Sequence, residues 1–141
     1  MKIVFTNGVF DLLHVGHVRL LHFARRQGDW LVVAINSDAS VRRIKGPSRP
    51  IVSAEERAEM LFALRCVDDV LIFEDDTPET LIRRLRPDVL VKGPSCQRTT
   101  IPGAEFVRSR GGSIVVPDWP IRHSTTQIVK QLKSARGSMT V

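Results

Sequence analysis

The chain has 141 residues and a formal net charge of +6, with 43% hydrophobic and 26% charged residues. This length suits one domain with a core of its own, and this balance is typical of a folded globular protein. No apolar run approaches the roughly 20 residues that span a bilayer, and the N-terminal MKIVFTNG carries no signal-peptide pattern. The two cysteines, Cys66 and Cys96, lack the spacing of a zinc or redox motif. We therefore expect a cytoplasmic protein with no membrane partner.

The positive charge is scattered along the chain instead of forming one block. Aromatic residues make up 6% of the sequence and tyrosine is absent, so platforms for stacking bases are scarce. A basic chain also suits polyanionic small molecules. We expect phosphorylated small molecules, and no nucleic acid, as partners.

Strand-like and helix-like segments alternate along the chain. Short apolar runs predict strands at residues 2–5, 30–36, 69–73, 88–92 and 113–117. Apolar periodicity predicts helices over residues 17–27, 54–66, 78–86, 102–110 and 125–135. Residues 37–52 are polar, basic and interrupted by glycine and prolines, so we expect a loop there.

Boundary residues support these elements. Three helix starts carry capping signals, namely Ser53 with Glu56, Thr77 with Pro78, and Ser124 with Gln127. The five alternations predict a single Rossmann-like α/β domain, doubly wound, with a five-stranded parallel sheet and helices on both faces. We place this domain at residues 1–136 and expect residues 137–141 to be a frayed tail. Ligands of such folds bind beyond the carboxyl ends of the strands.

The loop after the first strand combines glycines with two histidines. Gly8 and Gly16 allow backbone to approach a ligand closely, and His17 is expected at a helix N-terminus, where free N–H groups favour an anion. His14 and His17 either brace the turn or contact the oxygens of a phosphate chain. Zinc is disfavoured because no third and fourth ligand stand at a suitable spacing. The P-loop and dinucleotide-binding fingerprints are both absent.

The segment NGVFDLLHVGH resembles the G-x-F-D…H-x-G-H signature of the cytidylyltransferase-like nucleotidyltransferases. Further stretches, VAINSDASVRRIKGPSRPI among them, are similar to the adenylyltransferases that make ADP-activated heptose from D-glycero-D-manno-heptose 1-phosphate. The glycerol-3-phosphate cytidylyltransferases are more distant relatives with the same core. The resemblance implies transfer of a nucleotidyl group from a nucleoside triphosphate, ATP by preference, to a sugar phosphate, with Mg²⁺ and without a covalent enzyme intermediate. A non-catalytic module that binds nucleotide or nucleic acid is the alternative from another class.

The resemblance also implies roles for individual residues. Catalytic roles fall on four residues, His14, His17, Lys45 and Lys92. Nucleotide-binding roles fall on a larger group, Asn7, Gly8, Val9, Phe10, Gly16, Arg57, Gly93, Ser124 and Thr125. Two acids, Asp11 and Asp38, are candidates for binding the acceptor, and no residue is assigned to a metal.

Each assignment has a simpler alternative. Lys45 is either near the phosphates or a solvated loop lysine, and Arg57 is either near phosphate or paired with a neighbouring glutamate. Asp11 orients the first loop or contacts the acceptor or metal. Ser124 is at least a helix cap, and His22 is assigned to packing instead of chemistry.

Two segments depart from the pattern of the heptose and glycerol-3-phosphate enzymes. VKGPSC, with Pro94, Ser95 and Cys96, replaces the expected V-K-G-G-D-Y, and DWPIRHSTT places Arg122 and His123 out of register. Both departures bear on the choice of base or acceptor. The resemblance also suggests a homodimer, for which the apolar stretch 18–23 is a candidate surface unless it packs on the sheet.

Overall fold

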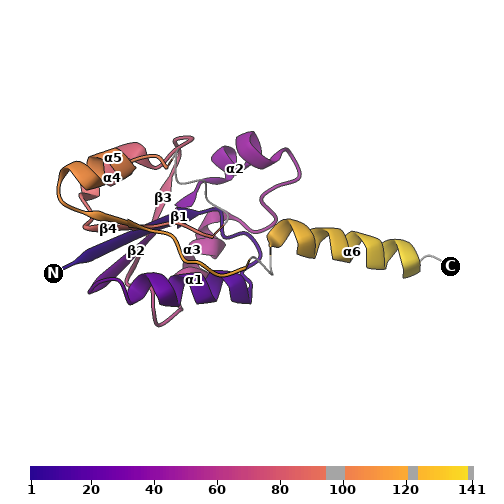
Figure 1. Cartoon of the computed structure of the whole chain (residues 1–141). Helices are drawn as coiled ribbons and strands as arrows, with labels where there is room; N and C mark the ends of the chain where they lie inside the picture. The colour runs from indigo at the N-terminus through magenta and orange to yellow at the C-terminus, as the bar shows by residue number, and fades with distance from the viewer. Residues whose placement is uncertain (95–100, 121–123, 140–141) are drawn as a thin grey trace.

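A computed structural model of the chain describes residues 1–94, 101–120 and 124–139. In this part of the chain five strands form one parallel sheet in the order β3-β2-β1-β4-β5 (Figure 1). The strands are β1 (Ile3–Gly8), β2 (Trp30–Asn36), β3 (Asp69–Phe73), β4 (Val89–Val91) and β5 (Ser113–Val115). The helices are α1 (Val15–Arg25), α2 (Asp38–Lys45), α3 (Ala54–Phe62), α4 (Glu79–Leu85), α5 (Ala104–Ser109) and α6 (Thr125–Met139). The predicted doubly wound α/β fold is confirmed.

The inner strand β2 shows why the sheet is covered on both faces. Leu31, Val33 and Ile35 point into a core cluster that also holds residues of α1 and α3. Val32 and Ala34 point into the opposite cluster, which holds residues of α4 and α5. Successive side chains of a strand alternate between faces, so a run that is apolar throughout requires a layer on each side.

The strand order reverses beside β1. From β1 the chain winds outward through β2 to β3, and then returns to place β4 on the other side of β1. Such a switch point leaves a crevice at the carboxyl ends of the two adjacent strands, where ligands of this fold class bind. Gly8 ends β1 and Val91 ends β4, so the loops that follow both strands open onto this crevice.

The segment 37–52 corrects one prediction, because it contains helix α2. Ser37 caps this helix by accepting a hydrogen bond from the backbone of Ser40, and Val41 is fully buried. Only two residues of α2 are buried, so its composition resembles that of a loop. Lys45 therefore ends a helix instead of lying in a loop.

Several boundaries also differ from the prediction. Helix α1 begins at Val15 with His14 as its N-cap, two residues before the expected start. The N-cap of α4 is Pro78 and not Thr77, and no side chain caps that helix. Helix α6 continues to Met139, into the segment for which fraying was expected.

Candidate active site

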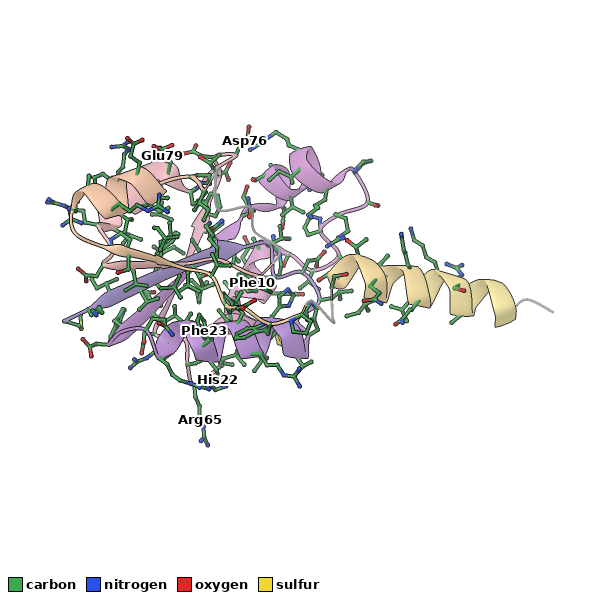
Figure 2. All side chains as sticks on the ribbon, in the orientation of Figure 1. Phe10, His22, Phe23, Arg65, Asp76 and Glu79 are labelled. Atoms are coloured by element: carbon green, nitrogen blue, oxygen red, sulfur yellow. The ribbon has the colours of Figure 1, made fainter. Side chains whose placement is uncertain are left out.

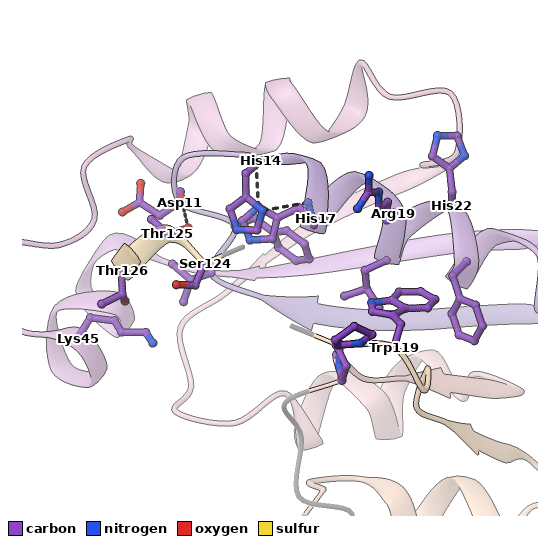
Figure 3. Close-up of a pocket in the computed structure, with 18 of the residues that line it drawn as sticks. Asp11, His14, His17, Arg19, His22, Lys45, Trp119, Ser124, Thr125 and Thr126 are labelled. Atoms are coloured by element: carbon purple, nitrogen blue, oxygen red, sulfur yellow. Dashed lines mark hydrogen bonds between the residues drawn. The ribbon is translucent and has the colours of Figure 1, made fainter. Parts of the chain in front are cut away.

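A cleft of about 930 Å³ lies at the switch point, between α1, the end of α2 and the start of α6 (Figure 3). The predicted site residues that line it are Val9, Phe10, Asp11, His14, Gly16, His17, Lys45, Gly93, Ser124 and Thr125. The remaining ones, Asn7, Gly8, Asp38, Arg57 and Lys92, do not line it. Ser95, Cys96, Arg122 and His123 lie outside the described residues.

His14 and His17 cap α1 reciprocally. The backbone N–H of Gly16 donates to Nδ1 of His14 at 3.1 Å, and the backbone N–H of His14 donates to Nδ1 of His17 at 3.2 Å. The two rings stack with their centroids 3.7 Å apart. Because each Nδ1 accepts a hydrogen bond, the neutral rings carry their protons on Nε2. Bracing the turn and donating Nε2–H to an anion are thus compatible roles.

His17 resists protonation. Burial and, to a smaller extent, the neighbouring His14 lower the pKa of His17 to about 4. Its ring also lies 5.1 Å from that of Phe10, which covers one side of it. At neutral pH His17 is therefore a neutral hydrogen-bond donor.

Asp11 holds the loop that follows α2 against the loop that follows β1. Its carboxylate accepts hydrogen bonds from Nε of Arg49 at 2.8 Å and from the backbone N–H groups of Ile51 at 2.8 Å and Val52 at 3.0 Å. The side chain is fully buried. Burial by itself would raise the pKa of Asp11, but these hydrogen bonds and the charge of Arg49 lower it. The structure thus supports the loop-orienting alternative for Asp11, since both carboxylate oxygens accept hydrogen bonds from the loop that follows α2. Its role as an acceptor ligand stays a prediction.

Arg57 fastens the same two loops from the other side. Its guanidinium donates to the carbonyl oxygens of Val52 and Val9 and to Oδ1 of Asp38, at 2.7–2.9 Å. The side chain is only 1% exposed, so the buried charge is matched by Asp38. Asp38 also accepts from the backbone N–H of Ala54. In this structure Arg57 and Asp38 contact each other and the backbone, and neither lines the cleft. Their ligand roles stay predictions.

Lys92 follows β4 directly and reaches across to β1. Its Nζ donates to Oδ1 of Asn7, and the residue is 8% exposed. Adjacent parallel strands bring these two positions together at the switch point. Gly93 and Pro94 continue from Lys92 into the lining of the cleft.

The start of α6 supplies a second helix N-terminus to the cleft. Ser124 Oγ accepts from the backbone N–H of Gln127 at 3.1 Å, as the capping signal predicted. Thr125 Oγ1 donates to the carbonyl oxygen of Asp11, a contact drawn in Figure 3. The helix start is therefore tied to the loop that carries the histidines.

One wall of the cleft was not predicted from the sequence. Arg19 and His22 of α1 and its C-cap residue Arg26 line it together with Trp119, whose ring meets that of Phe23 edge-on at 5.2 Å. The spacing of three and four residues along α1 is a signal that could have placed these three side chains on one face. His22, assigned to packing from the sequence, is exposed to the cleft.

The cleft is electropositive. Four cationic side chains line it in the described part of the chain, namely Arg19, Arg26, Lys45 and Arg49, against the single carboxylate of Asp11. Such an excess of one sign concentrates anions in a concave site.

No metal site is formed by these residues alone. Among the described residues no group of three His, Cys, Asp or Glu side chains could hold an ion. The carboxylate of Asp11, which lines the cleft, already accepts three hydrogen bonds. Mg²⁺ usually keeps several waters and binds substrate phosphates, so these residues fit it only as part of a nucleotide complex.

Comparison with known proteins identifies the family. The model of the cytidylyltransferase-like family matches residues 5–131, which include both histidines and the start of α6. The chain belongs to the cytidylyltransferase-like family. This confirms the family predicted from the segment Asn7–His17.

The curated relatives of this cytidylyltransferase-like chain are longer proteins. It is 54% identical to the bifunctional protein HldE of Syntrophotalea carbinolica over 130 residues, which are 92% of the chain and 26% of that protein. It is 52% identical to the bifunctional protein HldE of Gluconobacter oxydans over 134 residues, 95% of the chain and 28% of that protein. The chain thus spans about a quarter of the length of these relatives.

A solved structure shares the fold. The crystal structure of the lipopolysaccharide core biosynthesis protein from Thermoplasma volcanium GSS1 matches with a TM-score of 0.68 and 26% identity, over 82% of this chain and 93% of that chain. No helix in the described part of the cytidylyltransferase-like chain is long and apolar enough to cross a membrane.

Proposed function

We propose that the chain is a cytoplasmic, homodimeric nucleotidyltransferase that transfers AMP from ATP to D-glycero-D-manno-heptose 1-phosphate and releases pyrophosphate. The observation that carries this proposal is the stacked pair of His14 and His17 at the start of α1, inside an electropositive cleft. The choice of substrates is supported by the resemblance to heptose 1-phosphate adenylyltransferases and by the relatives named HldE.

The histidine pair suits the reacting phosphate. With Nδ1 of each ring used by backbone, Nε2–H is the donor that a phosphate oxygen can meet. Donors fixed in this way need no reorganisation as negative charge grows on the phosphate oxygens in the transition state. Because the acceptor phosphate is already ionised, no residue has to act as a general base.

The remaining cleft residues serve positioning and charge neutralisation, which dominate catalysis of phosphoryl transfer. Ser124 and Thr125 at the start of α6 offer a second helix N-terminus for the phosphate chain. Lys45 at the end of α2 brings an ammonium group to the same cleft. The nucleotide would enter as its Mg²⁺ complex, with the ion supplying further positive charge to the phosphates.

A pyrophosphate-release assay tests the proposal. The four nucleoside triphosphates are each combined with heptose 1-phosphate, other sugar 1-phosphates and glycerol 3-phosphate, and ATP with heptose 1-phosphate is expected to give the highest kcat/KM. Release of pyrophosphate with CTP and glycerol 3-phosphate instead would overturn the substrates but keep the reaction. No release with any pair would overturn the enzymatic proposal and favour a binding module.

A matched pair of histidine variants tests the mechanism. His17→Ala is expected to lower kcat by about 10²–10³, the effect of losing one fixed donor at a developing charge. His22→Ala removes an exposed histidine of the same helix and is expected to change kcat by less than about tenfold. Thermal unfolding of both variants establishes that they fold. Equal effects of the two substitutions would contradict the assigned role of His17.

A further inference from the structure

Helix α6 is held to the body of the protein only near its start. Figures 1 and 2 show that it extends away from the sheet and the other helices. Residues 130–136 are all exposed, and Leu132 is 62% exposed. An isolated helix of about this length is marginal in water, because most helical stability in proteins comes from packing of an apolar face. Within the described part of the chain, residues 130–136 of α6 therefore bury little of the apolar surface that usually stabilises a helix.

An apolar groove of about 860 Å³ lies between α6 and α3. Ile128 and Leu132, four residues apart and hence on one face of α6, line one side of it. Met60 of α3, which is 56% exposed, lines the other side with Leu13. The groove thus exposes large apolar side chains from two helices at once.

The two helices carry opposite charges. Glu55, Glu56 and Glu59 are exposed on α3, and the last two of these reach the rim or lining of the groove. Lys130, Lys133 and Arg136 are exposed on α6. None of these six side chains forms an ion pair within the described part of the chain. Each helix therefore presents charges for which a partner of the opposite sign is available on the other helix of a second copy.

We propose that this groove is the contact surface of the homodimer, with α6 of each copy packed on α3 of the other. The two-fold arrangement is self-complementary, because one surface carries both the acidic and the basic helix. That the protein is a dimer is part of the proposed function, on which this inference rests; the new element is the surface through which the two copies meet. It replaces the stretch 18–23 as the interface, since Leu21 is fully buried and Leu20 and Phe23 pack against the core.

The interface also bears on the active site. Ser124 and Thr125, which begin α6, line the cleft, and Thr125 donates to the carbonyl oxygen of Asp11 in the histidine loop. A partner that holds the outer turns of α6 also holds its first turn. Dimer formation is therefore expected to strengthen nucleotide binding.

Light scattering after size exclusion tests the surface. The wild-type chain is expected at the mass of two chains, and Leu132→Glu, which puts a carboxylate on the apolar stripe, at the mass of one. Ile72→Glu is the matched control. Ile72, on β3, is an aliphatic side chain that is 45% exposed, as Leu132 is exposed on α6, but it lies outside the groove. A wild-type monomer, a dimeric Leu132→Glu, or dissociation by Ile72→Glu alone would each overturn the proposal.

A charge exchange gives a second test that does not depend on apolar packing. Glu56→Lys with Glu59→Lys is expected to yield monomer, and so is Lys130→Glu with Lys133→Glu. An equimolar mixture of these two double variants is expected to restore a species of twice the mass when salt is low, because both α3–α6 contacts of the mixed pair then join opposite charges. Failure of the mixture to associate would contradict the pairing of α3 with α6.

Nucleotide affinity tests the coupling to the cleft. Binding of ATP, followed by calorimetry, is expected to weaken at least about threefold in Leu132→Glu, with thermal unfolding used to establish that the monomer is folded. Unchanged affinity would overturn the coupling. If the wild-type dimer forms through this surface but no substrate pair releases pyrophosphate, the proposed function fails and the interface stands.

Discussion

Replacing Asp11 by alanine is expected to lower the free energy of unfolding by about 3–5 kcal/mol, the usual cost of removing one partner from a buried ion pair. The carboxylate of Asp11 is fully buried and receives three hydrogen bonds, one from Arg49 and two from backbone. Its loss leaves the side chain of Arg49, only 11% exposed, without its counter-charge. It also leaves the N–H groups of Ile51 and Val52 without their acceptor. These costs all act on the same two loops.

Urea unfolding followed by circular dichroism measures this loss. Asp76→Ala is the control, because the side chain of Asp76 is 74% exposed and pairs with the half-exposed Arg43, so its removal is expected to cost no more than about 1 kcal/mol. If Asp11→Ala matched this control in stability, the assignment of Asp11 as a loop clamp would be refuted.

Asp11→Asn separates the clamp from a direct role in binding the acceptor. The amide keeps the shape and one acceptor oxygen but loses the charge, so we expect an intermediate loss of about 1.5–3 kcal/mol. KM for the acceptor is expected to rise only as far as the loop is loosened. A variant of wild-type stability that had lost acceptor affinity would show that Asp11 contacts the substrate.

Three further predictions concern the histidine pair, the second clamp and the cationic wall. Because the pKa of His17 is lowered to about 4, the unfolded chain binds a proton at this position at higher pH than the native protein does. This residue therefore makes the free energy of unfolding rise with pH between about 4 and 6.5. An NMR titration of His17 with a midpoint above 6 would contradict this. Arg57→Ala is expected to cost about 3–5 kcal/mol in urea unfolding, while Arg65→Ala, which removes a side chain that projects away from the protein in Figure 2, is expected to stay within about 0.5 kcal/mol. The double variant Arg19→Ala with Arg26→Ala is expected to raise KM of the anionic substrates several-fold with little change in kcat. It is also expected to weaken the dependence of kcat/KM on salt. An unchanged salt dependence would show that these two residues do not contribute to the electrostatic field of the cleft.

The features that the sequence predicted correctly are local ones. The continuous apolar run of β2 and the helical apolar period of α1 indicate the type of each element, since these patterns depend only on the element itself. The histidine signature likewise lies within one loop and the first turn of one helix, so its spacing can be recognised from the sequence alone. Helix α2 was missed because its burial of only Ser40 and Val41 leaves too weak an apolar period.

The sequence by itself therefore determined the fold class, the family and the position of the histidine pair. Only the tertiary structure decided what the charged residues do. Arg57 binds the carbonyl of Val9, 48 residues away, and Asp11 binds the backbone of Ile51, 40 residues away. A buried charge must find a partner, and which partner it finds depends on how distant loops meet. The pairing of Arg57 with Asp38, 19 residues apart, is an example that only the tertiary structure shows.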